Sequence, residues 1–315
     1  MTQNHCVELG AADLDKSRRL IFATLVNVGI VAVQLIGAAL SGSLALAADA
    51  GHNLADVLAL LLSLAALRLA CRLPTDTRTY GLHRTEIFAA FLNGLALFVI
   101  AFFVGREACL RLWAPPPIQT GLMLGTAVFG LLANWLVMTR LSAHKHDLNL
   151  RGAYLHMLGD VLASAGVIVA ALIMQFTHRY WVDPVISILI ALLILGGAWR
   201  LMAESIEILL LGVPRSLEVR NIADGMRAVE GVTDIHNMRL WAVCSNVYVM
   251  SAHVVIAEAG EAERVRIRQE LRDLLSHDYG VAEATLELEE AGCPASSLIH
   301  PLEHPEAHDH GEHEH

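Results

Sequence analysis

Six apolar stretches, each close to the length of a membrane-crossing helix, constrain this chain more than any other feature. They are Ile21–Leu40, Leu44–Leu67, Ile87–Val104, Gly121–Leu141, Ala153–Phe176 and Val185–Leu209. A helix needs about 20 apolar residues to cross a bilayer, because the hydrocarbon core is about 30 Å thick and each residue advances about 1.5 Å. The composition agrees, since 55% of the residues are hydrophobic and only 17% are charged. The pattern predicts a membrane α-helical protein with six transmembrane helices.

Basic residues between these stretches predict the orientation of the chain. Lys and Arg gather before the first stretch, between the second and third, and between the fourth and fifth. The other connections, around 41–43, 111–119 and 177–183, contain fewer of them. The positive-inside rule therefore places both termini in the cytoplasm. We expect a multi-pass protein of the cell (inner or plasma) membrane, in contact with lipid, whose second and fifth helices cross in opposite directions.

After Leu211 the apolar pattern gives way to a soluble one, and Gly212 and Pro214 close the last apolar run. The expected elements are a helix at 217–229, strands at 232–243 and 247–257, a charged helix at 261–275 and a strand at 284–289. This order predicts a small cytoplasmic α+β domain of ferredoxin-like type. The expected organisation is an N-terminal segment at 1–20, a transmembrane domain at 21–213, the cytoplasmic domain at 214–292 and a His-rich tail at 293–315.

Two His-x-x-x-Asp pairs lie inside the apolar stretches: His52 with Asp56, and His156 with Asp160. A spacing of four places both side chains of a pair on one helical face, where they offer one imidazole nitrogen and one carboxylate oxygen. Ionisable side chains within a membrane segment indicate a functional site, because their burial in hydrocarbon is costly. Four nitrogen and oxygen ligands suit tetrahedral zinc. The two pairs are expected at similar depth, so the sequence predicts a zinc site inside the membrane. The alternative is that each pair only satisfies a neighbouring helix.

Asp49 lies three residues before His52, on a neighbouring part of the same helical face. Two roles are open for it: guiding an ion towards the outer side, or capping the start of its helix. The intramembrane amides, Gln34 among them, are expected to hydrogen-bond between helices.

Several classes of function are excluded by composition and motif content. The net charge of -10, without a basic stripe, argues against a nucleic-acid partner. Five scattered cysteines without a C-x-x-C motif indicate a reduced, cytosol-facing protein. An enzyme is not expected, because the helices contain no HExxH motif or nucleophile elbow. The two pairs would also fill all four zinc positions, leaving none for a reacting water.

Three runs of sequence resemble the cation diffusion facilitator family, in its zinc-exporting branch. They are SGSLALAADAGHNLAD at 41–56, TYG and the following residues to Asn-Gly at 79–94, and NLRGAYLHMLGD at 149–160. The similarity covers about residues 20 to 290. It implies a dimeric metal/proton antiporter with six membrane helices and a cytoplasmic ferredoxin-like domain. It also implies that His52, Asp56, His156 and Asp160 form the transport site, in the ligand combination that accompanies zinc.

The predicted cytoplasmic domain contains a second group of residues, which resembles family positions where zinc helps to hold two protomers together. These residues are His236, Trp241, His253, Glu287 and Glu289. His236 and His253 are expected to be either zinc ligands or satisfied residues of the sheet. Further potential ligands are His5, Cys6, Cys293 and the tail residues His308, His310, His313 and His315.

A proton and a metal ion compete for imidazole and carboxylate ligands, because His must be neutral and Asp ionised to bind a cation. If the site opens alternately to the two sides, cytosolic zinc displaces a proton, and an external proton later displaces the zinc. The sequence thus predicts a zinc/proton antiporter that exports Zn²⁺ and acts as a homodimer. The alternatives are an exporter of Cd²⁺, Co²⁺ or Ni²⁺, and a membrane-bound metal sensor that binds without transporting.

Overall fold

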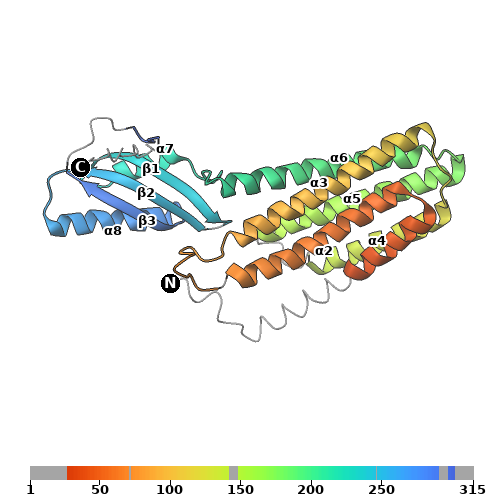
Figure 1. Ribbon diagram of the computed structural model, residues 1–315, viewed down its shortest axis with the longest axis horizontal. Coiled ribbons are helices and arrows are strands. Elements are labelled where there is room, and N and C mark those ends of the chain that lie inside the picture. The colour runs from red at the N-terminus through yellow and green to blue at the C-terminus, as the bar shows by residue number, and fades with distance from the viewer. Residues whose placement is uncertain (1–26, 71, 142–147, 246, 291–296, 302–315) are drawn as a thin grey trace, which may run out of the picture. The chain divides into compact units, whose positions relative to one another are not determined.

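The computed structural model describes residues 27–70, 72–141, 148–245, 247–290 and 297–301 (Figure 1). The chain divides into two compact units, Met1–Ile206 and Glu207–His315. The first unit is helical and apolar, and the second is built around a small sheet.

The first unit consists of a helix at Asn27–Ser41 followed by five helices of 22 to 30 residues. These are α2 (Leu44–Ala70), α3 (Thr85–Trp113), α4 (Thr120–Leu141), α5 (Leu148–Thr177) and α6 (Val182–Leu209). Among the described residues, α2, α3, α6 and the 159–177 part of α5 are long and apolar enough to cross a membrane. Two further apolar helices, Asn27–Ser41 and Thr120–Leu136, are shorter. The expectation of a helical membrane fold is confirmed.

The core of this unit contains many small apolar side chains, together with a few larger ones such as Met174. Helix α2 packs against α3 and α5, and α4 packs against α5. Helix α3 approaches α6 closely at Gly94, where a Cβ atom would lie 2.8 Å from Met202 Cγ. Small residues permit such close contacts between membrane helices. Phe103 and Leu193 are exposed on the outer surface of the unit, as expected for side chains that face lipid.

Helix α3 is longer than the apolar pattern predicts. The expected stretch stops at Val104, before two charged residues, but the helix continues to Trp113. Arg111 Nε donates to Glu107 Oε1 at 3.0 Å, a pairing one turn apart that supports the helix. Arg111 also donates to the carbonyl oxygen of Gly42 at 2.8 Å. The connection predicted at 111–119 is therefore confined to the residues after Trp113.

The second unit contains the predicted αββαβ order. Its elements are α7 (Val219–Arg227), β1 (Val232–Cys244), β2 (Val247–Ile256), α8 (Glu261–His277) and β3 (Val281–Glu289). The strands lie in the order β1-β2-β3, with β1 antiparallel to β2 and β2 parallel to β3. The parallel pair is possible because α8 connects β2 to β3. The expected α+β domain is confirmed.

The two faces of this sheet differ in character. Met250, Val254 and Leu288 belong to a core that also contains buried residues of α7 and α8, such as Ile222 and Leu271. Successive residues of a strand point to opposite faces, so the residues between these core positions point away from the helices. The histidines and glutamates singled out from the sequence occupy this second face.

Candidate metal-binding sites

The first group of metal-ligating side chains lies in the helical unit, where α2 and α5 pack together. His52 Nε2 is 3.3 Å from Asp160 Oδ1 and 3.8 Å from Asp56 Oδ2. One potential ligand atom from each of the three residues lies within 4.8 Å of the others. Asp160 is buried, and His52 and Asp56 are partly buried. The arrangement could hold a metal ion through one nitrogen and two oxygen atoms.

The helical spacing and the packing of α2 on α5 explain this arrangement. His52 and Asp56 are one turn apart on α2, so their side chains share a face. The contact between α2 and α5 brings Asp160 to the same place. His156 precedes Asp160 by one turn on α5, but its side chain lies outside the part of the molecule that the structure describes. Three of the four residues predicted from the sequence are therefore brought together.

The start of α2 is fixed by Asp183, at the beginning of α6. Asp183 Oδ2 accepts a hydrogen bond from the backbone N–H of Leu44 at 2.8 Å. Its Oδ1 accepts from the backbone N–H of Ala45 at 3.2 Å and from the Ser43 hydroxyl at 2.5 Å. The first backbone N–H groups of a helix have no partner within the helix, and these bonds satisfy two of them. Asp183 therefore caps α2, so the capping role considered for Asp49 is not needed.

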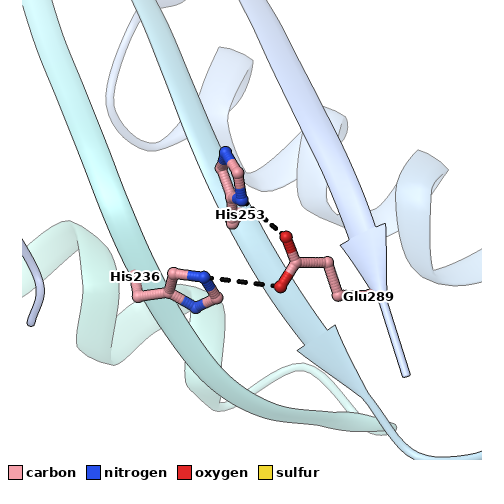
Figure 2. A group of neighbouring side chains, drawn as sticks. All are labelled: His236, His253 and Glu289. Carbon is pink, nitrogen blue, oxygen red and sulfur yellow. Dashed lines mark hydrogen bonds and ion pairs between the residues drawn. The ribbon is translucent and has the colours of Figure 1, made fainter. Parts of the chain in front are cut away.

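The second group lies on the face of the sheet that points away from α7 and α8 (Figure 2). His253 Nδ1 is 2.6 Å from Glu289 Oε1, and His236 Nε2 is 3.4 Å from Glu289 Oε2. The two imidazole rings lie 5.2 Å apart between centroids. Figure 2 shows the carboxylate of Glu289 facing both rings, with one oxygen directed to each. Each of these three residues offers one potential ligand atom, and the three atoms lie within 4.8 Å of one another.

Strand register produces this second group. His236 on β1 pairs with His253 on β2, and Glu289 on β3 lies beside Val255, two residues further along β2. The register of β1 shifts between His236 and Arg239, and Asn237 in this bulge has a φ of 46°. Asparagine tolerates this left-handed conformation better than most residues. The bulge brings Asn237 Nδ2 to 3.1 Å from His253 Nε2, where the amide can donate to the ring.

The donor set of this second group suits zinc. Two imidazoles and one carboxylate are common zinc ligands, and a fourth position would remain for another donor. His236 is almost completely buried, and its Nδ1 has no hydrogen-bond partner among the described residues. Glu287 lies further out, with its Oε2 3.6 Å from His253 Nε2 and its side chain mostly exposed. Trp241 pairs with Val249 further along the sheet and is not part of the group.

The structure adds Asn237 to the residues of the second group. Asn237 was not singled out from the sequence, and its position directly after His236 is the only signal for its role. The remaining ligand candidates lie outside the described residues; they are His5, Cys6, Cys293 and the four tail histidines.

Comparison with known proteins assigns both units to one family. The profile of the cation efflux transmembrane domain matches residues 20–210, and that of the cation efflux protein cytoplasmic domain matches residues 214–291. The chain is 39% identical to the zinc transporter ZitB of Escherichia coli over 282 residues, which cover 89% of each chain. It is 36% identical to the metal cation efflux system protein CzcD of Cupriavidus metallidurans over 277 residues, covering 88% of this chain and 87% of the relative.

A third relative has a broader name. The cadmium, cobalt and zinc/H(+)-K(+) antiporter of Bacillus subtilis is 34% identical over 275 residues, which cover 86% of this chain and 88% of the relative. The chain therefore belongs to the cation efflux family, also called the cation diffusion facilitator family. It is a multi-pass membrane transporter with a cytoplasmic C-terminal domain, and not an enzyme.

Proposed function

We propose that this protein exports Zn²⁺ from the cytoplasm in exchange for protons. The observation that carries the proposal is the convergence of His52, Asp56 and Asp160 within an apolar helical unit, with potential ligand atoms within 4.8 Å of one another. His156, one turn from Asp160 on α5, is proposed as the fourth ligand. The site would then be tetrahedral, with two nitrogen and two oxygen ligands, and closed to a reacting water.

Charge balance supports this assignment. Two ionised carboxylates offset the two positive charges of Zn²⁺, so the loaded site is formally neutral. A neutral site lowers the electrostatic cost of holding a divalent ion in a medium of low dielectric constant. Without metal, a proton on His52 would face Asp160 across 3.3 Å, and this proton offsets one of the two negative charges.

Exchange follows because zinc and protons compete for the same atoms. Zinc requires a neutral imidazole, so its binding from the cytoplasm releases the proton from His52. Protons arriving from the other side protonate the imidazole and release the zinc. The ligands come from two different helices, so a relative movement of α2 and α5 would change the affinity of the site as its access changes sides. His52 and His156 thus carry the exchanged proton, and Asp56 and Asp160 supply the charge.

The cytoplasmic domain is proposed to bind zinc through His236, His253 and Glu289 and to mediate homodimerisation. The match to a domain of this family at residues 214–291 supports such a role, as does the fit of the donor set to zinc. We assign transport to residues 21–213, and zinc binding and homodimerisation to residues 214–292. The segment 1–20 precedes these two domains, and the His-rich tail 293–315 follows them. Both termini are proposed to lie in the cytoplasm, with the helical unit in the inner or plasma membrane.

Export of another divalent ion is the second candidate. The name of the Bacillus subtilis relative includes cadmium and cobalt, and a nitrogen and oxygen ligand set does not by itself select zinc over Cd²⁺, Co²⁺ or Ni²⁺. A membrane-bound sensor would use the same ligands without moving ions.

Zinc uptake into proteoliposomes under an imposed pH gradient tests the proposal. We expect gradient-dependent Zn²⁺ movement with the intact protein, and its loss with His52→Ala or Asp160→Asn. His277→Ala serves as the matched control, because this exposed histidine lies at the end of α8. Tight zinc binding without flux in the intact protein would favour a sensor, and faster flux of Cd²⁺ or Co²⁺ than of Zn²⁺ would favour the second candidate.

A further inference from the structure

Asp49 is a buried carboxylate that the proposed exchange at His52 does not use. It lies on α2, one turn before His52, and is 1% exposed. Its Oδ2 accepts hydrogen bonds from Gln34 Nε2 at 2.9 Å and from the Ser164 hydroxyl at 3.1 Å. Three helices therefore meet at one carboxylate oxygen: Asn27–Ser41, α2 and α5.

The surrounding packing shows that this polar contact is built into the fold. Asn53 Nδ2 donates to Gln34 Oε1 at 2.9 Å, which leaves the Gln34 amide nitrogen directed to Asp49. Helix α4 makes room for this amide at Gly130, where a Cβ atom would lie 2.5 Å from Gln34 Nε2. Any larger residue at position 130 would displace the amide that bonds to Asp49.

The second carboxylate oxygen of Asp49, Oδ1, has a different environment from Oδ2. Asp49 Oδ1 is buried and has no hydrogen-bond partner among the described residues. No ion pair of Asp49 with Lys, Arg or His is found in the described part of the chain. A buried carboxylate without a compensating positive charge is strongly disfavoured. A proton on Oδ1 removes this penalty and leaves both hydrogen bonds to Oδ2 in place.

The charged neighbours of Asp49 belong to the candidate metal site. His52 on the same helix and Asp160 on α5 both act electrostatically on Asp49. The helix Asn27–Ser41 and residues 120–136 of α4 contain no charged residue, and α3 contains none between Glu86 and Arg106. In the described part of the chain, the two charged groups that act on Asp49 therefore both belong to the candidate metal site.

We propose that Asp49 is a second proton-carrying group of the transporter, separate from the metal ligands, which loses its proton when Zn²⁺ occupies the neighbouring site. This inference rests on the proposed function. Zinc entry breaks the N–H bond of protonated His52 and the O–H bond of Asp49, and both protons pass to water. One divalent cation enters as two protons leave, so the net charge of the region does not change.

Proton release on zinc binding tests the inference in the full-length protein. ZnCl₂ is added to the detergent-solubilised protein in weak buffer, and an indicator dye reports the protons released for each zinc ion bound. Asp49→Asn keeps the size and polarity of the side chain but cannot titrate. Glu107→Gln is the matched control, because it removes a carboxylate of the same unit from a surface ion pair with Arg111. Protons released at the cytoplasmic site are the same in all three proteins and cancel in the comparison.

We expect Asp49→Asn to bind zinc and to release about one proton fewer per ion than the intact protein, with Glu107→Gln unchanged. Equal release from Asp49→Asn and the intact protein would overturn the inference. Loss of zinc binding in a folded Asp49→Asn protein would also overturn it, because Asp49 would then be a ligand.

Infrared difference spectra of the intact protein provide a test that needs no variant. Zinc addition should remove the C=O band of a protonated carboxyl group, and an unchanged band would contradict the inference. The proton-gradient-driven zinc flux of the intact protein is a separate measurement, so the inference can fail while the proposed function holds.

Discussion

Leu44 donates its backbone N–H to Asp183 Oδ2 at 2.8 Å, which joins the first residue of α2 to the first turn of α6. Asp183 and Ser43 are both buried, and their side chains bond to each other. The negative charge of Asp183 also lies at the positive end of the α2 helix dipole. This cap fixes the start of the helix that carries His52 and Asp56, eight and twelve residues further on.

Removing this cap should destabilise the helical unit. Asp183→Ala leaves the N–H groups of Leu44 and Ala45 and the Ser43 hydroxyl without their acceptor, and loss of a helix cap costs about 1 to 2 kcal/mol. We expect a lower unfolding temperature in detergent for Asp183→Ala, and an intermediate value for Asp183→Asn, which keeps one acceptor. Exposed Asp76→Ala is the control. Equal unfolding temperatures for Asp183→Ala and the intact protein would show that the cap adds nothing to stability.

The intramembrane zinc ion should have only nitrogen and oxygen ligands. In a His236→Ala/His253→Ala double variant, which lacks two ligands of the cytoplasmic group, X-ray absorption should show four ligands at about 2.0 to 2.2 Å and no sulfur at about 2.3 Å. Adding His156→Ala should remove one imidazole from the spectrum. A sulfur ligand, or an unchanged spectrum after His156→Ala, would contradict the proposed set.

Glu289 and Glu287 form a natural pair of test positions in the cytoplasmic domain. They lie two residues apart on one face of β3, but Glu289 contacts both imidazoles and Glu287 is mostly exposed. Glu289→Ala should weaken zinc binding by this domain more than about tenfold, since even indirect partners of metal ligands contribute about 10-fold to 100-fold. Glu287→Ala should change the affinity much less. Calorimetric titration of the full-length protein with Zn²⁺ measures both, and a larger effect at Glu287 would rule out the proposed group.

Replacing a nitrogen ligand of the intramembrane site by an oxygen ligand should alter which metal ion the protein transports. His52→Asp retains a ligand at the same position but adds a third carboxylate, and oxygen-rich sites favour harder cations such as Mn²⁺. We expect the ratio of Zn²⁺ to Mn²⁺ flux in proteoliposomes to fall in this variant. His277→Asp is the control, because it makes the same exchange on the surface of α8. An unchanged ratio in His52→Asp would indicate that His52 does not contact the transported ion.

Local patterns predicted much of this molecule, and contacts between distant residues were harder to predict. The spacing of His52 and Asp56 and the orientation of the helices were enough to expect Asp160 nearby, because helical geometry and membrane depth determine both. The end of α3 was not predicted by the apolar pattern, since the helix continues through Glu107 and Arg111 to Trp113. The Asp183 cap joins residues 139 apart in sequence, and no local pattern indicates such a contact. The Asn237 bulge was also missed, because register shifts depend on the partner strand.

The most direct test of proton-coupled zinc transport at this site is to impose a zinc gradient across proteoliposome membranes, without a pH gradient, and to follow the internal pH with a trapped dye. Inward zinc movement should drive protons outward and make the interior more alkaline, and Asp160→Asn should abolish both movements. Zinc uptake by the intact protein without any change in internal pH would contradict the account.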